Sequence, residues 1–454
     1  MTAAPEAWVV IDLGFGDAGK GSVTDALVRS RGATLVVRYN GGAQAGHNVV
    51  TPDGRHHTFS QFGAGHFAGA ATLLGPAFLL HPLGMAVEAE RLATVAPDPW
   101  SRTWVDARCR VITPYQQAAG QLRERLRGDA AHGSCGVGVG ECVADHLDHP
   151  DERLTVGDLD DRVTVRTRLR RQRERKRSEL VALGAPADAL TLFDDPGLID
   201  RVIHAWATVA SRLQRLDPDA VAARVRTTPR VVFEGAQGVL LDETWGFHPH
   251  TTWSDTTAHH ALALAGDRPV WRLGVTRAYM VRHGAGPFPT AGALDVPERH
   301  NRDDGFQGRF RTGALDGVLL RYAAEVCGGV DALAITCLDA VPPSGPDAPS
   351  SRASADGART MGASRSPPPV PGCAAYAGGG PPDLITADGR RLLPGAPDDL
   401  RHRERLGALL RSVQPVVEPH DPCALAEASV GAPVWLESWG PDAGGKRWRP
   451  GAPA

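Results

Sequence analysis

Apolar runs that end in glycine-rich turns recur along the first third of the chain and predict alternating strands and helices. The run Trp8–Ile11 leads into such a turn and then into a helix-like segment. Ala33–Arg38 is a second strand pattern with a glycine-rich turn after it. Ala71–Leu80 encloses a further strand and is followed by the helix-like Gly84–Val95. Strands that alternate with helices are typical of a parallel sheet with helices packed on its faces.

The same alternation continues through the rest of the chain. Because glycine turns follow several of the strands, the pattern places a site at the carboxyl ends of the strands. We therefore expect one large α/β domain with a central, mostly parallel sheet and a phosphate loop after the first strand, in an architecture like that of P-loop GTPases. The further elements are helices at Gln116–Arg127 and Leu315–Val326, and strands within Arg230–Leu241, Trp271–Val281, Ala332–Thr336 and Pro433–Glu437.

Two segments depart from this alternation. Arg162–Leu183 is densely basic with a few glutamates, which favours a solvated helix face, and an anionic ligand site is the alternative. Val341–Pro371 is rich in Pro, Ser, Ala and Gly and has few large apolar side chains. Such a segment cannot offset the entropy of ordering, so we expect a disordered insertion at residues 341–371 within a domain that spans residues 1–454.

Composition narrows the class of protein. The chain has 454 residues, 42% of them hydrophobic, and a net charge of −3, so no basic nucleic-acid surface is indicated. Seven cysteines, an odd number with no CxxC pair, favour reduced thiols over a disulfide framework. No signal-like start is present, and no apolar run reaches the roughly 18 residues of a membrane helix. These observations favour a cytoplasmic protein.

The turn after the first strand carries the strongest local signal. Gly14-x-x-x-x-Gly19-Lys20 fits the spacing of a phosphate loop, in which backbone N–H groups, a helix N-terminus and a lysine hold phosphate oxygens. Gly21 stands where Ser or Thr normally binds magnesium, and Ser22 comes one residue later. Asp17 adds an acid within the loop. The alternative is an ordinary glycine-rich turn of a doubly wound protein.

Taken together, the turns resemble the adenylosuccinate synthetase family. Gly16–Ser22 is similar to its phosphate loop GDEGKGK, and Gln44–His47 is similar to its NAGH turn. The matches occur in chain order over most of the sequence, which is far more specific than one glycine motif. The other matching segments are Phe233–Gly238, Gly284–Thr290, Arg311–Asp316, Thr336–Asp339 and Ser438–Asp442.

The resemblance implies a reaction in two steps. An aspartate removes a proton from IMP so that O6 attacks the γ-phosphate of GTP, and the amino group of L-aspartate then displaces the 6-phosphate. Asp17 matches the catalytic base and magnesium ligand, because a carboxylate beside Mg²⁺ stays ionised and can accept a proton. His47 matches the histidine that stabilises the migrating phosphoryl group, and Lys20 the phosphate-loop lysine. A helix-capping Asp and a turn His are the structural alternatives.

The resemblance also implies a set of binding residues. For GTP these are Gly16, Ala18, Gly19, Lys20, Gly21, Ser22, Gly46, His47, Asn48, Cys337, Leu338, Asp339, Ser438, Trp439 and Gly440. For the acceptor nucleotide they are Gln44, Ser134, Cys135, Gln237, Thr252 and Arg309. For the amino acid they are Arg309, Arg311 and Thr312, and for Mg²⁺ they are Asp17 and Gly46.

The nucleobase residues explain a preference for GTP and include two departures from the family. Asp339 can accept from N1–H and N2–H₂ of guanine, a pairing that adenine cannot make. Cys337 replaces a lysine whose stem would cover the base. Trp439 replaces a threonine and offers a stacking surface, with packing in the core as the alternative.

Further departures fall in the acceptor and amino-acid sites. Cys135 replaces a threonine of the IMP phosphate loop and is a poorer hydrogen-bond donor. The arginine that the family sends from a neighbouring subunit aligns with His149, and Arg153 is near by. The loop Gly305–Gly313 lacks a threonine pair of the family and contains Phe306 and Phe310. Arg309 and Arg311 can still bind a carboxylate.

We expect a GTP- and Mg²⁺-dependent ligase that makes adenylosuccinate from IMP and L-aspartate, acting as a homodimer without nucleic-acid or membrane partners. One alternative is a specialised paralogue that uses another oxo-purine-like nucleotide or another amine, for instance in a nucleoside-antibiotic pathway. A second alternative, from another class, is an inactive nucleotide-binding regulator. Asp17, Lys20 and His47 together argue against the regulator, because binding alone needs no base. A GTPase switch is a weaker alternative still.

Overall fold

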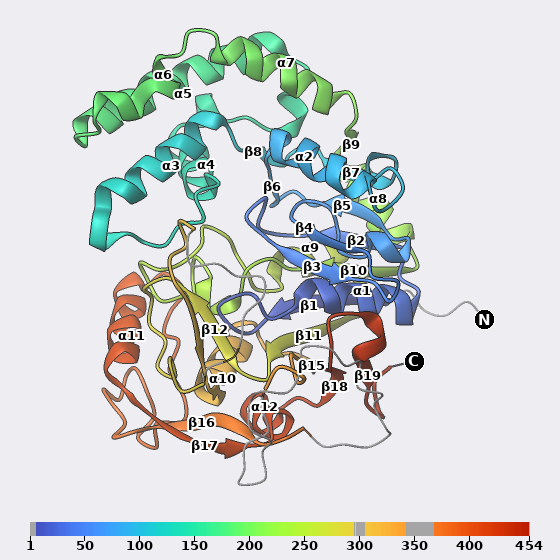
Figure 1. Ribbon diagram of the computed structural model, residues 1–454, viewed down its shortest axis with the longest axis vertical. Helices are drawn as coiled ribbons and strands as arrows, with labels where there is room; N and C mark the ends of the chain where they lie inside the picture. The colour runs from blue at the N-terminus through green and yellow to red at the C-terminus, as the bar shows by residue number, and fades with distance from the viewer. Residues whose placement is uncertain (1–5, 295, 297–304, 342–366, 454) are drawn as a thin grey trace.

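A ten-stranded sheet forms the centre of the protein, seen in a computed structural model that describes residues 6–294, 296, 305–341 and 367–453 (Figure 1). All neighbouring strands in it are parallel except the last pair, β18 and β19. The expected α/β class with a mostly parallel sheet is therefore confirmed. In spatial order the strands are β19 (Lys446–Trp448), β18 (Val434–Ser438), β15 (Ala332–Thr336), β11 (Val270–Arg277), β1 (Glu6–Asp12), β10 (Arg230–Glu234), β2 (Leu35–Arg38), β5 (Ala71–Leu74), β7 (Thr103–Asp106) and β9 (Gln214–Leu216).

The sheet is covered on both faces, because successive side chains of a strand point to opposite sides. Trp8 and Val10 of β1 pack with Leu27 of α1 (Lys20–Arg31). Val9 and Ile11 belong to the opposite core, together with residues of α8 (Pro218–Thr227), α9 (His259–Ala265) and α10 (Gly317–Val326). Burial on both faces explains why the strands read as continuous apolar runs in the sequence.

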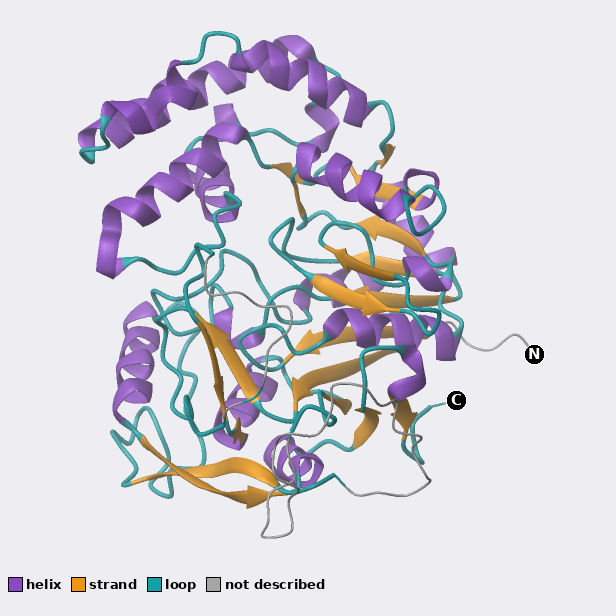
Figure 2. Ribbon diagram, in the orientation of Figure 1, coloured by secondary structure: helices purple, strands orange, loops and turns teal. Residues whose placement is uncertain are grey.

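The other helices and strands lie around this sheet, many of them beyond its two ends (Figure 2). Helices α3 to α7 form a helical layer beyond the β9 end, drawn at the top of Figure 1. The small sheets within residues 280–316 and 370–420 lie toward the opposite end with α10 to α12. The helices are α2 (Pro82–Ala93), α3 (Pro114–Arg127), α4 (Val139–Asp148), α5 (Arg162–Ala182), α6 (Thr191–Asp194), α7 (Leu198–Ala210), α8 (Pro218–Thr227), α9 (His259–Ala265), α10 (Gly317–Val326), α11 (Leu400–Ser412) and α12 (Pro422–Val430). The small sheets pair β3 (His47–Val50) with β4 (His56–Phe59), β6 (Leu79–Leu80) with β8 (Arg110–Val111), β12 (Met280–His283) with β13 (Phe310–Gly313), and β14 (Leu315–Asp316) with β16 (Val370–Ala377) and β17 (Gln414–His420).

Several expected boundaries differ from those in the structure. The single strand expected over Trp271–Val281 is two strands, because the chain leaves the central sheet after Arg277 and β12 pairs with β13 instead. The helix expected from Leu315 begins at Gly317, since the carboxylate of Asp316 caps it by accepting from the N–H groups of Val318 and Leu319.

The range expected for the insertion, residues 341–371, is also too wide. Residues 342–366 lie outside the described residues, but Val341 is 5% exposed within the core and Val370 begins strand β16. Val370 is 1% exposed and packs into the core. The prolines around it masked this buried strand in the sequence pattern.

The basic segment 162–183 forms helix α5, and many of its charges have acidic partners. Lys176 is 1% exposed and contacts Glu141 and Asp145 of α4 at 2.6 and 3.0 Å. Arg175 contacts Asp145 and Glu152 at 2.7 Å each. This part of the helix is therefore a packed, ion-paired face that fixes α4, whereas the sequence favoured a solvated one.

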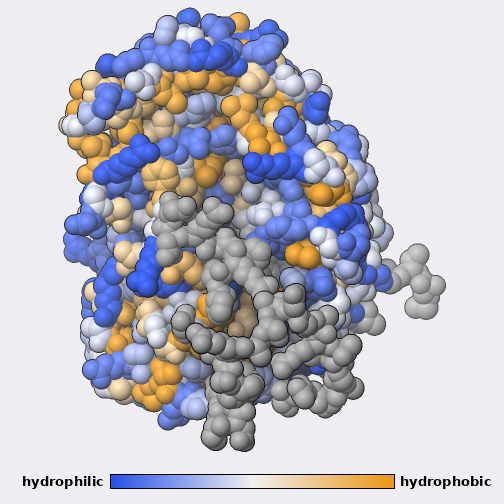
Figure 3. All heavy atoms as spheres, in the orientation of Figure 1, coloured by the Kyte–Doolittle hydropathy of each residue, from blue (hydrophilic) through white to orange (hydrophobic). Residues whose placement is uncertain are grey.

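All seven cysteines are free thiols, as expected from their number and spacing. Among the described residues, no helix has the length and apolar character to cross a membrane. Figure 3 shows polar side chains over much of the visible face, with apolar side chains gathered between them on the helical layer.

Candidate functional site

A cavity of about 1370 Å³ lies at the carboxyl ends of the central strands. It collects segments that are far apart in the sequence, from the turn after β1 to the turn after β18. Most of the residues expected from the sequence line it. These are Gly16, Asp17, Gly19, Lys20, Gly21, Ser22, Gln44, Gly46, His47, Asn48, Ser134, Cys135, Gln237, Thr252, Cys337, Asp339, Ser438 and Gly440.

The phosphate loop is held in shape by Asp12, the last residue of β1. Its buried carboxylate accepts from the N–H groups of Gly14 and Ala18 at 2.8 and 3.1 Å. It also contacts the Lys20 ammonium at 2.7 Å, with both side chains almost fully buried. Such a pair organises a loop, because removing one partner would leave an uncompensated buried charge. Sequence reasoning missed Asp12, which reads as an ordinary end of an apolar strand.

Asp17 stands in the left-handed region at φ 57°, a conformation that a non-glycine residue adopts at a cost of about 1 kcal/mol or more. The loop is fixed around it from two neighbouring strands. Arg277 of β11 donates to the carbonyl of Asp17 at 2.6 Å, and Thr336 of β15 donates to the carbonyl of Ala18 at 2.7 Å. The strained backbone therefore presents the Asp17 carboxylate to the cavity.

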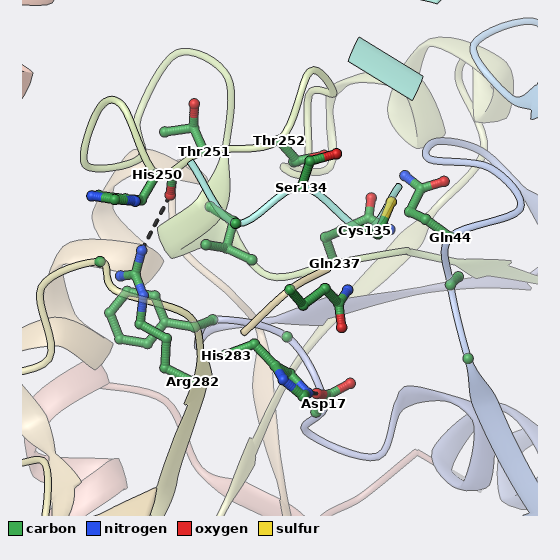
Figure 4. A pocket seen from close by; sticks show the side chains of 18 of the residues that line it. Asp17, Gln44, Ser134, Cys135, Gln237, His250, Thr251, Thr252, Arg282 and His283 are labelled. Carbon is green, nitrogen blue, oxygen red and sulfur yellow. Dashed lines mark hydrogen bonds and ion pairs between the residues drawn. The ribbon is translucent and has the colours of Figure 1, made fainter. Parts of the chain in front are cut away.

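His283, at the end of β12, lies against the Asp17 carboxylate. Its Nε2 is 3.5 Å from Asp17 Oδ2, and the two side chains adjoin in Figure 4. Burial raises the pKa of Asp17. The hydrogen bond from His283 and the positive charges of Arg277 and Lys20 lower that pKa by more than burial raises it, so the net shift is downward. Asp17 is therefore ionised at neutral pH. His283 has one signal in the sequence, its place directly before the matching segment Gly284–Thr290.

His47 is oriented by a buried acid and an arginine. Its Nδ1 lies 2.5 Å from Glu234 Oε1, and Glu234 also accepts from the N–H of Ala64 at 3.0 Å. Arg38 lies 3.9 Å from the same carboxylate, and all three side chains are at most 6% exposed. Burial lowers the pKa of His47 although Glu234 opposes that shift. The imidazole is thus neutral at pH 7, with Nε2 left for a ligand.

The nucleobase residues lie on two adjoining turns. Leu338 N–H donates to the carbonyl of Ser438 at 3.1 Å, which joins the turn after β15 to the turn after β18. Asp339 is exposed in the cavity, and Cys337 adopts a left-handed φ of 56°. Trp439 does not line the cavity. Its indole N–H donates to Glu437 at 3.0 Å and its partly buried ring packs beside the core.

The acceptor side of the cavity contains amides that have buried polar atoms without partners. Both side-chain polar atoms of Gln44 and the carbonyl oxygen of Gln237 are buried and unpaired among the described residues. In Figure 4 Gln237 stands between Ser134 and Cys135 on one side and Asp17 and His283 on the other. Because buried polar atoms are costly when unpaired, these amides are suited to hold a polar ligand.

The residues expected to hold the amino acid are not brought to the cavity wall. Arg309 is exposed, Arg311 donates to the carbonyl of Gly286 at 2.7 Å, and Thr312 donates to the carbonyl of Leu294 at 2.5 Å. Ala18 and Leu338 likewise lie behind the wall. Phe310 packs edge-on against His283 with ring centroids 4.9 Å apart.

Phe306 lies over the acceptor turn. It is 37% exposed, and a Cβ on Gly136 would come within 2.7 Å of its ring. Neither Phe306 nor Phe310, the two phenylalanines that depart from the family's loop, lines the cavity.

Sequence comparison finds one family. The adenylosuccinate synthetase family matches residues 9–343. An adenylosuccinate synthetase of Synechococcus sp. (strain WH7803) is 34% identical over 354 residues, which cover 73% of this chain and 75% of the relative. One from Hamiltonella defensa is 32% identical over 344 residues, covering 73% and 76%.

Two solved structures share the fold. The fully ligated adenylosuccinate synthetase of Plasmodium falciparum superposes with a TM-score of 0.71 at 17% identity, covering 97% of this chain and 99% of that one. The succinoaminodeoxyadenylate synthetase of cyanophage S-2L, bound to dGMP and to dATP as an energy donor, superposes with a TM-score of 0.58 at 15% identity, covering 98% and 96%.

Proposed function

The chain belongs to the adenylosuccinate synthetase family, and we propose on that premise that its cavity joins IMP to L-aspartate with GTP as the energy donor. The protein is a ligase of purine nucleotide biosynthesis. One observation carries the proposal for the site. A single cavity holds the ionised Asp17, the phosphate-loop Lys20, the oriented His47 and the nucleobase residue Asp339.

In the first step Asp17 accepts the proton from the ring nitrogen of IMP next to C6. The electron pair of the broken N–H bond allows O6 to attack the γ-phosphorus of GTP, and the bond between the γ-phosphorus and the GDP oxygen breaks. Lys20 and His47 face the phosphate oxygens over which charge spreads in this transition state. The low pKa of Asp17 limits its strength as a base, so positioning against the ring nitrogen contributes strongly.

In the second step the amino group of L-aspartate attacks C6 and the 6-phosphate leaves as inorganic phosphate, which carries O6 with it. The amine loses a proton as the C–N bond forms, and the departing phosphate takes up that proton. We assign Arg311, with Arg309 beside it, to the carboxylates of L-aspartate. A desolvated carboxylate is costly unless charged donors pair with it.

We assign Mg²⁺ to Asp17 and the carbonyl of Gly46, which both belong to the cavity wall. The described residues contain no group of three or more His, Cys, Asp or Glu side chains that would form a metal cage. A site with one carboxylate is suited to Mg²⁺, which commonly binds through one or two carboxylates together with substrate phosphates. The Asp17 side chain is 38% exposed and ionised, which fits that role. Bound Mg²⁺ neutralises the phosphate charge that develops during transfer.

The specialised paralogue remains the second candidate, and one observation favours it. Arg309, Arg311 and Thr312 lie off the cavity wall, so the amino-acid site is the least complete part of the structure. The likeness to the cyanophage enzyme supports this alternative only at the level of the fold.

A ligation assay tests the proposal. The purified protein is incubated with Mg²⁺, GTP, IMP and L-aspartate, each omitted in turn, and products are identified by mass spectrometry. We expect adenylosuccinate, GDP and inorganic phosphate only in the complete mixture. Arms with dGMP in place of IMP and with other amino acids in place of aspartate test the paralogue. GTP binding without any product in all arms would favour the regulator.

We also propose a homodimer, because the resemblance to the adenylosuccinate synthetase family implies that state. Light scattering at the concentration of the assay should report twice the mass of the chain. A fully active monomer would contradict this proposal.

A further inference from the structure

Lys446 places a partly buried ammonium group beneath the nucleobase turn, defined here as Ser438–Asp442. It lies on the edge strand β19, where it pairs in register with Ser438 of β18. Its Nζ donates to the carbonyls of Gly440 and Asp442 at 2.7 and 3.0 Å. Ser438 and Gly440 line the cavity, so this cation sits directly behind the wall that faces the donor base.

Acidic side chains near Lys446 attract its positive charge. Burial lowers the pKa of its ammonium to about 8, against the attraction of Asp442, Asp339 and Asp25. The ammonium is therefore still mostly protonated at pH 7. It has three N–H groups, of which two are used on carbonyls among the described residues.

Guanine and adenine present opposite patterns to such a site. Guanine has the acceptor O6 next to the donors N1–H and N2–H₂, whereas adenine has the donor N6–H₂ next to the acceptor N1. Asp339 supplies an acceptor for the guanine donors. A cation under the adjoining turn favours the O6 acceptor.

We propose that Lys446 is a specificity-determining residue for the donor nucleotide, forming with Asp339 a complementary donor and acceptor that select guanine over adenine. The inference rests on the proposed use of GTP. Lys446 acts through the turn and through its charge, because its side chain lies behind the cavity wall.

The test compares Lys446→Met with the parent protein. We expect kcat/KM for GTP to fall about tenfold while kcat/KM for ATP stays level or rises, because the positive charge that favours the O6 acceptor of guanine is lost. The matched control is Arg447→Met on the same strand, whose guanidinium lies 5.6 Å from the Trp439 ring. The control should keep the GTP to ATP ratio of the parent.

A second measurement separates this inference from the ligase assignment. Titration calorimetry with GDP and ADP needs no turnover, so it reports base preference even if no adenylosuccinate forms. Preference for GDP that is lost in Lys446→Met supports the inference in that case. If Lys446→Met lowers kcat/KM for GTP and ATP equally, and the affinity for GDP and ADP equally, then Lys446 only braces the turn. That result would overturn the inference. If Lys446→Met does not fold, Lys446→Gln, which keeps N–H donors without the charge, replaces it with the same expected ratio change.

Discussion

The Nδ1 atom of His47 lies 2.5 Å from Glu234 Oε1, although the two residues are 187 positions apart in the sequence. The contact joins the start of β3 to the end of β10 and fixes which ring nitrogen faces the ligand. Glu234 is fully buried, and its partners among the described residues are His47, Arg38 and the N–H of Ala64. His47 is thereby held ready for the phosphoryl group.

Glu234→Gln should lower kcat by at least about tenfold with little change in KM for IMP, since the amide no longer selects the tautomer of His47. His47→Asn alone and the double variant should show non-additive losses, as expected for residues that act as a unit. Steady-state kinetics on variants with unchanged circular dichroism provide the measurement. A Glu234→Gln protein with parental kcat would remove Glu234 from the site.

Asp17→Asn should reduce phosphoryl transfer by at least about 100-fold and leave the fold intact, because the amide keeps the shape and loses the base. Formation of GDP in the presence of IMP measures this step. Activity within a few-fold of the parent would exclude Asp17 as the base.

Asp339→Asn should weaken GTP more than ATP, because an acceptor becomes a donor that faces the N–H groups of guanine. Initial rates with each nucleotide across a concentration series give the ratio of kcat/KM values. The prediction fails if the parent already uses ATP as well as GTP.

The assignment of Arg311 to the amino acid predicts that Arg311→Ala raises KM for L-aspartate by about tenfold or more, while KM for GTP is unchanged. Arg309→Ala should have a smaller effect, because Arg309 is exposed. If neither change affects aspartate use, or if the parent accepts a neutral amino acid better, both residues only brace the loop.

We predict that the folded protein loses stability in acid because of the buried His146. Burial lowers its pKa to about 4, and its Nε2 is buried without a partner among the described residues. The unfolded chain, with an ordinary pKa near 6.5, binds the proton first as pH falls, so the free energy of unfolding declines from about pH 6.5 to pH 4 by about 3 kcal/mol. Urea unfolding of His146→Gln should show a smaller decline than the parent. His204→Gln, an exposed histidine on α7, should decline as the parent does.

Sequence patterns were sufficient for the strands that run into glycine turns, because buried parallel strands and phosphate-type turns both leave local signals. They were insufficient where a partner comes from far along the chain. Asp12 and Glu234 read as ordinary strand ends, and only the fold shows that one holds Lys20 and the other His47. The break between β11 and β12 left no glycine or proline to mark it, since Ala278 and Tyr279 make the crossing.

The central claim is that O6 of the acceptor is phosphorylated before the amine attacks. IMP labelled with ¹⁸O at C6 is incubated with the protein, Mg²⁺, GTP and L-aspartate, and the inorganic phosphate is analysed by mass spectrometry. The two-step mechanism predicts one ¹⁸O atom in each phosphate released with adenylosuccinate. Unlabelled phosphate formed alongside adenylosuccinate would contradict the mechanism, because the γ-phosphate would then have gone to water and not to the purine.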